Sequence, residues 1–343
     1  MASRPQASHL PFLRFTVSIL LSGCLLLSAS AGFGKSEDSA PGAVYVGTYE
    51  GVINPVTAEY FNRILTDAQE AGAAAVVLRL DTPGGLDTSM RLIIKDITAS
   101  PIPVIVYVAP SGGRAASAGV FILYAAHIAA MAPGTNVGAA HPVAMGGGEM
   151  DAVMKAKVEN DAAAYIKSIA EKRGRNAQWA EDAVRKSVSV TEREALSLKV
   201  IDLIADDVPS LLAAVDGREV VTGAGKVVLR TKGARLKEIP MGWRLEALKA
   251  LSDPNIAFIL MTLGTIGLLA ELYNPGAILP GIVGAISLIL AFYSLQTLPI
   301  NYAGVLLTIL GIVLFILEIK VVSYGLMSLG GIAAMTFGAL LLV

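Results

Sequence analysis

The sequence predicts a layered α/β domain with a mostly parallel sheet, followed by an α-helical membrane domain. Apolar runs of strand length alternate with helix-like segments between residues 41 and 251, a pattern typical of βαβ units. From residue 256 onward, apolar stretches of about 20 residues follow one another, each long enough to span a bilayer core. The predicted boundaries are 41–215 for the α/β domain, 216–253 for a linker, and 254–343 for about four membrane helices.

Composition supports a membrane protein and argues against a nucleic-acid partner. Hydrophobic residues make up 54% and charged residues only 16%, against about 25% charged in soluble proteins. The 27 Lys and Arg nearly cancel the 28 Asp and Glu, so no strong positive field would attract nucleic acid. The acidic residues of the membrane stretches, Glu271 and Glu318, lie near predicted span ends, where snorkelling is favoured over a functional intramembrane acid.

The first 31 residues are typical of a signal peptide. Two arginines precede an apolar run over residues 15–27, and Ala29-Ser30-Ala31 provides the small residues for cleavage after Ala31. Two alternatives stay open: a lipoprotein box ending at Cys24, or an uncleaved anchor helix. Cleavage after Ala31 would leave a chain without cysteine and therefore without a disulfide framework.

The strands and helices of the α/β domain can be predicted in order from their periodicity. Valine-rich or continuously apolar runs predict strands, and apolar residues at a spacing of three or four predict helices. Glycine and proline mark the breaks between them. The predicted strands are 43–49, 73–81, 101–110 and 127–133, and the predicted helices are 54–72, 86–100 and 115–126.

Two glycine-rich loops follow predicted strands, at residues 81–86 (DTPGGL) and 111–114 (SGGR). In open parallel sheets, ligands and chemistry gather at the carboxyl ends of the strands. Neither loop reads G-x-G-x-x-G, and the chain has no phosphate-binding G-x-x-x-x-G-K-[ST] motif. We therefore expect no nucleotide cofactor, and no pattern of metal ligands is evident.

Ser117, in the stretch SGGRAASAGV, is the candidate nucleophile. A serine at a helix start can simply cap the helix. Here its neighbours are small, so a peptide could approach the hydroxyl, and the Gly84-Gly85 pair offers N–H groups suited to an oxyanion. A catalytic serine also needs a base.

Two residues compete for the role of base. His141 lies 24 residues beyond Ser117 and could form a Ser-His pair. Lys157 lies on a predicted helix and could act as base if burial made it neutral, whereas Lys155 points elsewhere. From spacing alone, a solvated helix face is favoured over a catalytic role for either lysine. His127 is expected to be a core or strand-edge residue.

The motifs DTPGG, SGGRAASAG and KVENDAAAYI together resemble the NfeD family of membrane-bound ClpP-class serine peptidases. The resemblance implies a ClpP/crotonase-like fold with a Ser-Lys dyad. By motif, Ser117 is the nucleophile and Lys157 the base, and Gly84 or Gly85 forms the oxyanion hole with the amide of Ala118. His141 stays as the alternative base, because soluble ClpP peptidases use a Ser-His-Asp triad.

The predicted function is a membrane-bound serine endopeptidase that cleaves apolar segments of membrane proteins or peptides. We expect a multi-pass protein of the bacterial cell membrane with its peptidase domain outside the cytoplasm. The resemblance also implies a stomatin-like (SPFH) partner and a homo-oligomer. A non-catalytic scaffold for a stomatin-like partner is the alternative. A crotonase-like acyl-CoA enzyme is a third reading, disfavoured by export from the cytoplasm.

Overall fold

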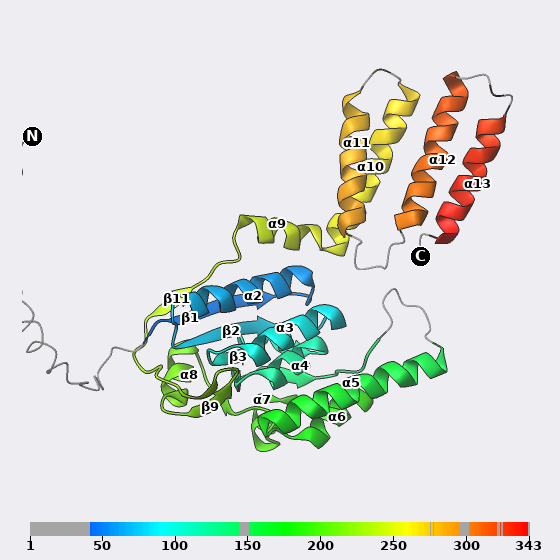
Figure 1. Ribbon diagram of the computed structural model, residues 1–343. Coiled ribbons are helices and arrows are strands. Elements are labelled where there is room, and N and C mark those ends of the chain that lie inside the picture. Colours follow the sequence, from blue (N-terminus) through cyan, green and yellow to red (C-terminus); the bar gives the residue numbers. More distant parts are fainter. Residues whose placement is uncertain are drawn as a thin grey trace, which may run out of the picture. The chain divides into compact units, whose positions relative to one another are not determined.

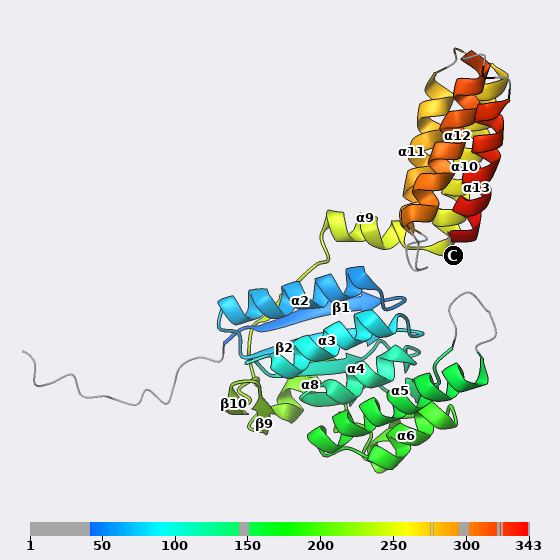
Figure 2. The ribbon, with the colours of Figure 1, turned by 45° about the vertical axis from the view of Figure 1, so that its right-hand side comes forward.

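The computed structural model describes residues 42–274 apart from 144–150, together with 276, 278–294, 302–320, 323 and 325–341. In this part of the chain an α/β domain is followed by four apolar helices (Figure 1, Figure 2). The predicted signal peptide and the Cys24 alternative lie outside the described residues.

A six-stranded parallel sheet forms the centre of the α/β domain, in the order β11-β1-β2-β3-β5-β8. The four strands predicted from apolar runs are confirmed as β1, β2, β3 and β5. The carboxyl ends of the sheet strands share one edge, and the glycine-rich loops follow β2 and β3 there. The bounds are β1 Val44–Glu50, β2 Ala75–Asp81, β3 Val104–Val108, β5 Ile128–Met131, β8 Leu203–Ile204 and β11 Leu236–Glu238.

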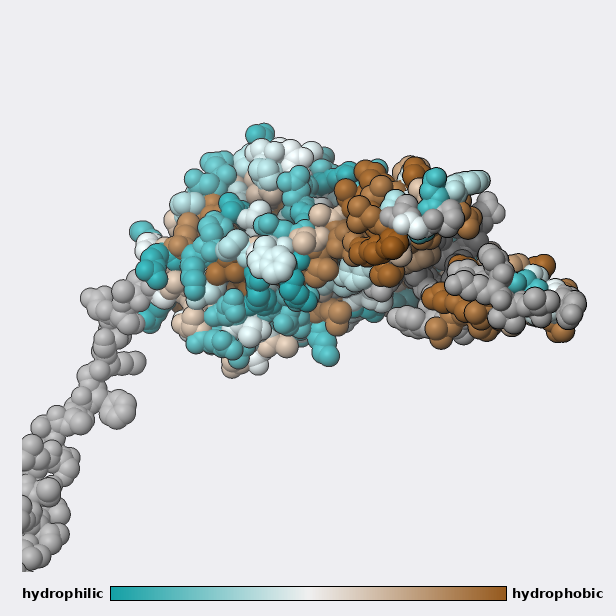
Figure 3. Space-filling model, turned by 90° about the horizontal axis from the view of Figure 1, so that it is seen from above, coloured by the Kyte–Doolittle hydropathy of each residue, from teal (hydrophilic) through white to brown (hydrophobic). Residues whose placement is uncertain are grey.

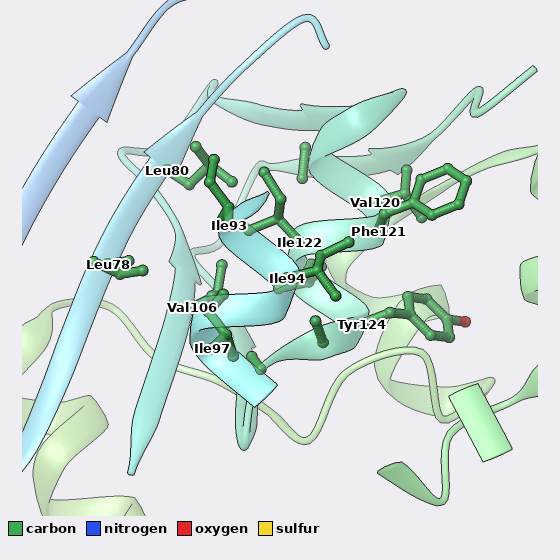
Figure 4. Packing of buried hydrophobic residues seen from close by; sticks show 14 of the residues in the cluster. Leu78, Leu80, Ile93, Ile94, Ile97, Val106, Val120, Phe121, Ile122 and Tyr124 are labelled. Atoms are coloured by element: carbon green, nitrogen blue, oxygen red, sulfur yellow. The ribbon is translucent and has the colours of Figure 1, made fainter. Parts of the chain in front are cut away.

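Helices cover both faces of this sheet. Because successive side chains of a strand point to opposite faces, Leu78 of β2 packs with α2, α3 and α4, whereas Val77 packs with α8. Figure 4 shows the first of these layers, where strand residues such as Leu80 meet Ile93 of α3 and Ile122 of α4. Each such side chain contributes about 1.5–3 kcal/mol when fully buried. The bounds are α2 Pro55–Glu70, α3 Asp87–Ala99, α4 Ala118–Ala125 and α8 Val208–Val215.

A small second sheet carries the residues around Ser117. Its strands are β4 (Arg114–Ala116), β6 (Asn136–Gly138) and β7 (Ser189–Thr191), in the order β4-β6-β7. Thr82 forms an isolated bridge to Ala115, so the end of β2 leads directly onto this sheet. The remaining helices of the region are α5 (Ala152–Arg173), α6 (Ala177–Arg185) and α7 (Glu192–Ser197).

The segment 216–253, which the sequence predicts to be a linker, is folded. It contains the hairpin of β9 (Glu219–Thr222) and β10 (Gly225–Val228), then β11 and α9 (Trp243–Leu251). β11 adds to the sheet beside β1, and Leu245 of α9 is buried in the core. These strands have only three or four residues, too few for an apolar period to be visible in the sequence.

The four apolar stretches form two helical hairpins, α10 with α11 and α12 with α13. Their surfaces are hydrophobic, in contrast to the largely hydrophilic α/β domain (Figure 3). α10 includes a stretch, Asn255–Tyr273, that is long and apolar enough to cross a membrane; the corresponding stretches in the other described helices are shorter. The bounds are α10 Pro254–Tyr273, α11 Leu279–Ser294, α12 Tyr302–Lys320 and α13 Leu326–Leu341.

The two hairpins use the same close contact. A Cβ on Gly264 of α10 would lie 3.0 Å from the carbonyl oxygen of Gly284 in α11. A Cβ on Gly311 of α12 would lie 2.9 Å from that of Gly331 in α13, and this second glycine pair lies 47 residues after the first. Small residues let membrane helices approach at backbone distance. The contact therefore recurs at a fixed sequence interval.

Glu318, near the end of α12, caps the start of α13. Its carboxylate accepts hydrogen bonds from the Ser323 hydroxyl (2.6 Å) and from the N–H groups of Gly325 and Ser328 (3.0 Å each). The carboxylate therefore pairs with N–H groups at the start of α13 that have no partner within α13 itself. This role differs from the snorkelling that the sequence suggested.

Candidate active site

Ser117 lies on a sharp turn between β4 and α4. Its backbone has φ 52° and ψ −116°, a conformation that costs a non-glycine residue about 1–3 kcal/mol. Its N–H donates to the Gly138 carbonyl (3.2 Å), which ties the turn to β6. The side chain makes no capping bond to α4, so the helix-cap interpretation of this serine is wrong.

The Gly84-Gly85 loop lies against Ser117. A Cβ on Gly84 would be 2.5 Å from the Ser117 Cβ and 2.9 Å from its Oγ, so no larger residue fits without displacing the serine. A Cβ on Gly85 would overlap the backbone of Ile53. Both glycines are thus required by close approach, one to the serine and one to the loop after β1.

Hydrogen bonds fix the orientation of this loop. The buried Thr82 hydroxyl accepts from the Gly84 N–H (3.0 Å), and the Gly84 carbonyl accepts from the Ile53 N–H (2.8 Å). A peptide unit is planar and trans, so its C=O and N–H point in opposite directions. The Gly85 N–H therefore points away from Ile53.

Two N–H groups near the serine remain available for a ligand. Within the described residues, neither the Gly85 N–H nor the Ala118 N–H has a hydrogen-bond acceptor. Of the two glycines that the sequence left open, Gly84 already donates to Thr82, whereas Gly85 has a free donor. Thr82 was not among the residues predicted from the sequence, although threonine two residues before a glycine pair is typical of a side-chain-stabilised turn.

Lys157 lies on the first half of α5, and its side chain is exposed to water. The buried residues of α5 lie in its second half, and there α5 packs toward the helix that Ser117 begins. Lys157 and Tyr165 are two turns apart on one face, and Tyr165 stacks on Phe121 with ring centroids 6.1 Å apart. Phe121 is one turn after Ser117. The structure thus brings the two helix faces together but leaves the ammonium group in water.

The two histidines have different surroundings. His141 is half-buried, and its Nδ1 lies 2.9 Å from the Val184 carbonyl oxygen, so this nitrogen carries a proton and donates to α6. His127 is buried, and its Nδ1 accepts from the Val104 N–H (3.1 Å). Burial, reinforced by Arg173 and other cations, lowers the pKa of His127 to about 3. His127 is therefore a neutral core residue, as predicted.

In the part of the chain that the structure describes, no three His, Cys, Asp or Glu side chains gather in a way that could hold a metal ion. The chemistry available at Ser117 is that of a hydroxyl, two backbone donors and a nearby helix that carries a lysine. A serine on a strained strand-to-helix turn, facing a fixed glycine pair at the carboxyl edge of a parallel sheet, is typical of a serine hydrolase.

Comparison with known proteins gives the family. Residues 43–214 match the family described as NfeD1b, N-terminal domain, and residues 255–343 match the NfeD integral membrane domain. The membrane-bound protease PH1510 of Pyrococcus horikoshii is 36% identical over 328 residues, which cover 94% of this chain and 73% of the relative. The membrane protein NfeD1b of Bacillus subtilis is 33% identical over 333 residues, covering 92% and 71%. The chain belongs to the NfeD family.

Two solved structures of a similar protein match the α/β domain. They are mutants of the membrane-bound stomatin-specific protease 1510-N. A serine-to-alanine mutant has a TM-score of 0.55 at 37% identity, covering 59% of this chain and 99% of the other. A lysine-to-alanine mutant in complex with a substrate peptide has a TM-score of 0.58 at 35% identity, covering 62% and 99%. This chain is accordingly a membrane-bound serine peptidase of the Ser-Lys type.

Proposed function

We propose that this chain cleaves peptide bonds in apolar segments of membrane proteins or peptides, with Ser117 as nucleophile and Lys157 as general base. The observation that carries the proposal is the strained, uncapped Ser117 beside Gly84. A backbone conformation of this cost persists only where the surrounding structure imposes it, and such sites cluster at functional centres. A non-catalytic scaffold would have no need of it.

The proposed reaction has two steps. Lys157 takes the proton from the Ser117 hydroxyl as Oγ attacks the peptide carbonyl carbon, and the oxyanion accepts hydrogen bonds from the Gly85 and Ala118 N–H groups. The proton then passes to the leaving amine, and the C–N bond breaks to give an acyl-enzyme ester. A water molecule, deprotonated by Lys157, hydrolyses the ester and restores the serine.

The exposure of Lys157 bears on how such a dyad would be completed. A lysine can act as base only in its neutral form, which removal from water favours. In the single chain the side chain is exposed. We propose that a bound peptide or a second copy of the chain covers the first half of α5 and completes the site. A second copy in this place would make the working enzyme a homo-oligomer.

The relatives indicate the class of partner. The similar protease 1510-N is described as specific for a stomatin homologue. We propose by analogy that a stomatin-like membrane protein is the substrate or partner here. An apolar substrate would suit the exposed Val153 and Met154, which lie on α5 one turn before Lys157.

We further propose that the signal peptide is cleaved and that the two hairpins cross the membrane four times, with the peptidase domain outside the cytoplasm. Cleavage after Ala31 would remove the sole cysteine, Cys24. A cysteine placed at the exposed Lys226 would then be the single thiol of the mature chain. Labelling of that thiol by a membrane-impermeant maleimide in intact cells would support this topology, and labelling only after lysis would refute it.

The function is tested by hydrolysis of quenched fluorescent apolar peptides by the full-length protein in detergent. We expect Ser117→Ala and Lys157→Ala to abolish turnover, and His141→Ala to retain it. Loss with His141→Ala and retention with Lys157→Ala would instead assign a Ser-His pair. Absence of hydrolysis by the folded wild type, with or without a stomatin-like protein, would favour the scaffold.

A further inference from the structure

Arg91 of α3 connects the three parts of the proposed catalytic centre. Its Nε lies 2.8 Å from Asp87 Oδ2, and its Nη2 lies 2.5 Å from Asp161 Oδ2. Its Cζ lies 4.3 Å above the ring of Tyr165. Asp87 begins α3 two residues after Gly85, whereas Asp161 and Tyr165 lie on α5.

These contacts follow the helical spacing of the dyad. Lys157, Asp161 and Tyr165 are successive members of one α5 face, four residues apart. Tyr165 stacks on Phe121, which is four residues after Ser117. Arg91 thus contacts the α5 face that carries Lys157 and the start of α3, which follows the oxyanion loop. Through Tyr165 it also connects to α4, the helix that Ser117 begins.

Arg91 also forms an ion pair with Asp161, the one carboxylate of α5 that lies a single turn from Lys157. At a spacing of four residues, Asp161 could pair with the Lys157 ammonium and hold it in its charged form. In the structure Asp161 pairs with Arg91 instead. The planar guanidinium can serve two carboxylates and a ring at once, which a lysine ammonium cannot do with the same geometry.

We propose that Arg91 is a positioning residue for the peptidase reaction: it sets the register of α5 against the oxyanion loop, so that Lys157 can reach Ser117. This inference rests on the proposed Ser117–Lys157 dyad. Ion pairs as exposed as these contribute little to stability. Catalysis is more sensitive, because a displacement of about 1 Å can cost about 100-fold in rate.

The test uses the full-length protein in detergent, with two readouts: the kcat and KM for a quenched apolar peptide, and the rate at which a fluorophosphonate labels Ser117. We expect Arg91→Met to lower kcat and labelling by about 10- to 100-fold, with KM and the thermal midpoint nearly unchanged. Arg91→Lys should recover part of the loss. Asp161→Asn should lower labelling too, and its effect should not add to that of Arg91→Met.

Arg185→Met is the matched control. Arg185 of α6 also holds α5, through Glu159 (3.3 Å) and Asn160 (2.8 Å), but it ties α5 to α6 rather than to α3 and the oxyanion loop. An equal loss with Arg185→Met would show general anchoring of α5 and overturn the inference. The inference would also be overturned if a fluorophosphonate labelled Arg91→Met at the wild-type rate. If Arg91→Met does not fold, Arg91→Lys and Asp161→Asn decide the question by the same criteria.

The two proposals fail differently. If Lys157→Ala or Ser117→Ala retains hydrolysis, the dyad itself is wrong, and the inference about Arg91 falls with it. If both variants lose hydrolysis while Arg91→Met and Asp161→Asn keep it, the dyad stands and Arg91 has no positioning role.

Discussion

The two ends of α4 differ in how their backbone groups are used. At the first end, Ser117 is strained and uncapped, and the Ala118 N–H has no acceptor within the described residues. At the last end, the carbonyls of residues 124–126 accept hydrogen bonds from Arg173 and Arg175 at 2.8–2.9 Å. Both arginines come from the end of α5 and the residues just after it.

This difference shows where the domain places its unsatisfied groups. Helix ends leave four N–H and four C=O groups without intrahelical partners. Here the Ala118 N–H at the first end stays free for an oxyanion, whereas the carbonyls at the far end accept hydrogen bonds from the buried Arg175 and the half-buried Arg173. Substitutions at the far end should therefore reduce stability, and substitutions at the first end should reduce activity.

Replacement of Arg175 should have the largest effect. Arg175→Met removes the partner of the Asp202 carboxylate (2.5 Å) and of two carbonyls, all at a guanidinium that is almost fully buried. Removal of one member of a buried pair costs about 3–5 kcal/mol. We expect this loss in urea unfolding followed by Trp179 fluorescence, since Trp179 stacks on Tyr124.

Arg244→Met is the control for Arg175, because the Arg244–Glu59 pair is exposed to water and should contribute little to stability. Equal losses for the two variants would mean that the far end of α4 has no special role in stability.

Gly84→Ala tests the first end. The new Cβ would lie 2.5 Å from the Ser117 Cβ, on a backbone with φ 120°. We expect peptide hydrolysis to fall by about 10²–10³-fold, as when an oxyanion donor is lost, because the loop and the serine must move apart. Gly72→Ala is the control: it has φ 61° but nothing within 4 Å, so it should lose about 1 kcal/mol of stability and no activity. Unchanged hydrolysis by Gly84→Ala would contradict the proposed oxyanion site.

His127, which directly follows the far end of α4, gives a pH-dependent prediction. Burial, then Arg173 and Arg175, lower its pKa to about 3, against an ordinary histidine pKa of 6.5. Between these values the unfolded chain binds a proton at His127 that the folded chain does not. The contribution of neutral His127 to the free energy of unfolding is therefore complete above about pH 6.5 and falls as the pH drops toward 3. From pH 7 to pH 5 we expect a loss of about 2 kcal/mol.

His127→Asn should remove this pH dependence, because an amide oxygen can accept the Val104 N–H without titrating. The comparison is made by urea unfolding of both proteins at pH 7 and pH 5. The same pH dependence in both would show that other groups are responsible.

Thr82 should have the smallest of these effects. Thr82→Val removes the buried hydroxyl that accepts from the Gly84 N–H, and leaves that donor without its partner. We expect the loss of this hydrogen bond to cost about 1–3 kcal/mol. Most of this cost should appear as slower hydrolysis, because the loop loses its fixed orientation. Thr82→Ser keeps the hydroxyl and should remain near wild type; a similar loss in both variants would trace the effect to packing of the methyl group.

The sequence predicted the elements that are long and periodic. The continuous apolar run of β2 and the amphipathic spacing of α2 are local signals, and the structure confirms them. β11 could not be predicted, because its three residues, Leu236–Glu238, are exposed and are defined only by pairing with β1. Short strands of this kind depend on tertiary contacts rather than on an apolar pattern.

The candidate site was predictable to a similar degree. Ser117 and the glycine pair form motifs that can be read along the chain. The choice between Gly84 and Gly85 required the Thr82 and Ile53 hydrogen bonds, which depend on how two loops pack. The contact of Arg91 with Asp161 could not be predicted either, because it joins two helices through residues 70 positions apart.

The Glu318 cap has a consequence for how the second hairpin can sit in a lipid bilayer. Hydrocarbon offers no hydrogen bonds, so a turn between membrane helices normally has to reach headgroups or water to satisfy its N–H groups. The start of α13 instead has an acceptor within the same hairpin, a carboxylate that replaces water for three donors. This helix end therefore needs fewer hydrogen bonds from water or headgroups than a helix end without such a carboxylate.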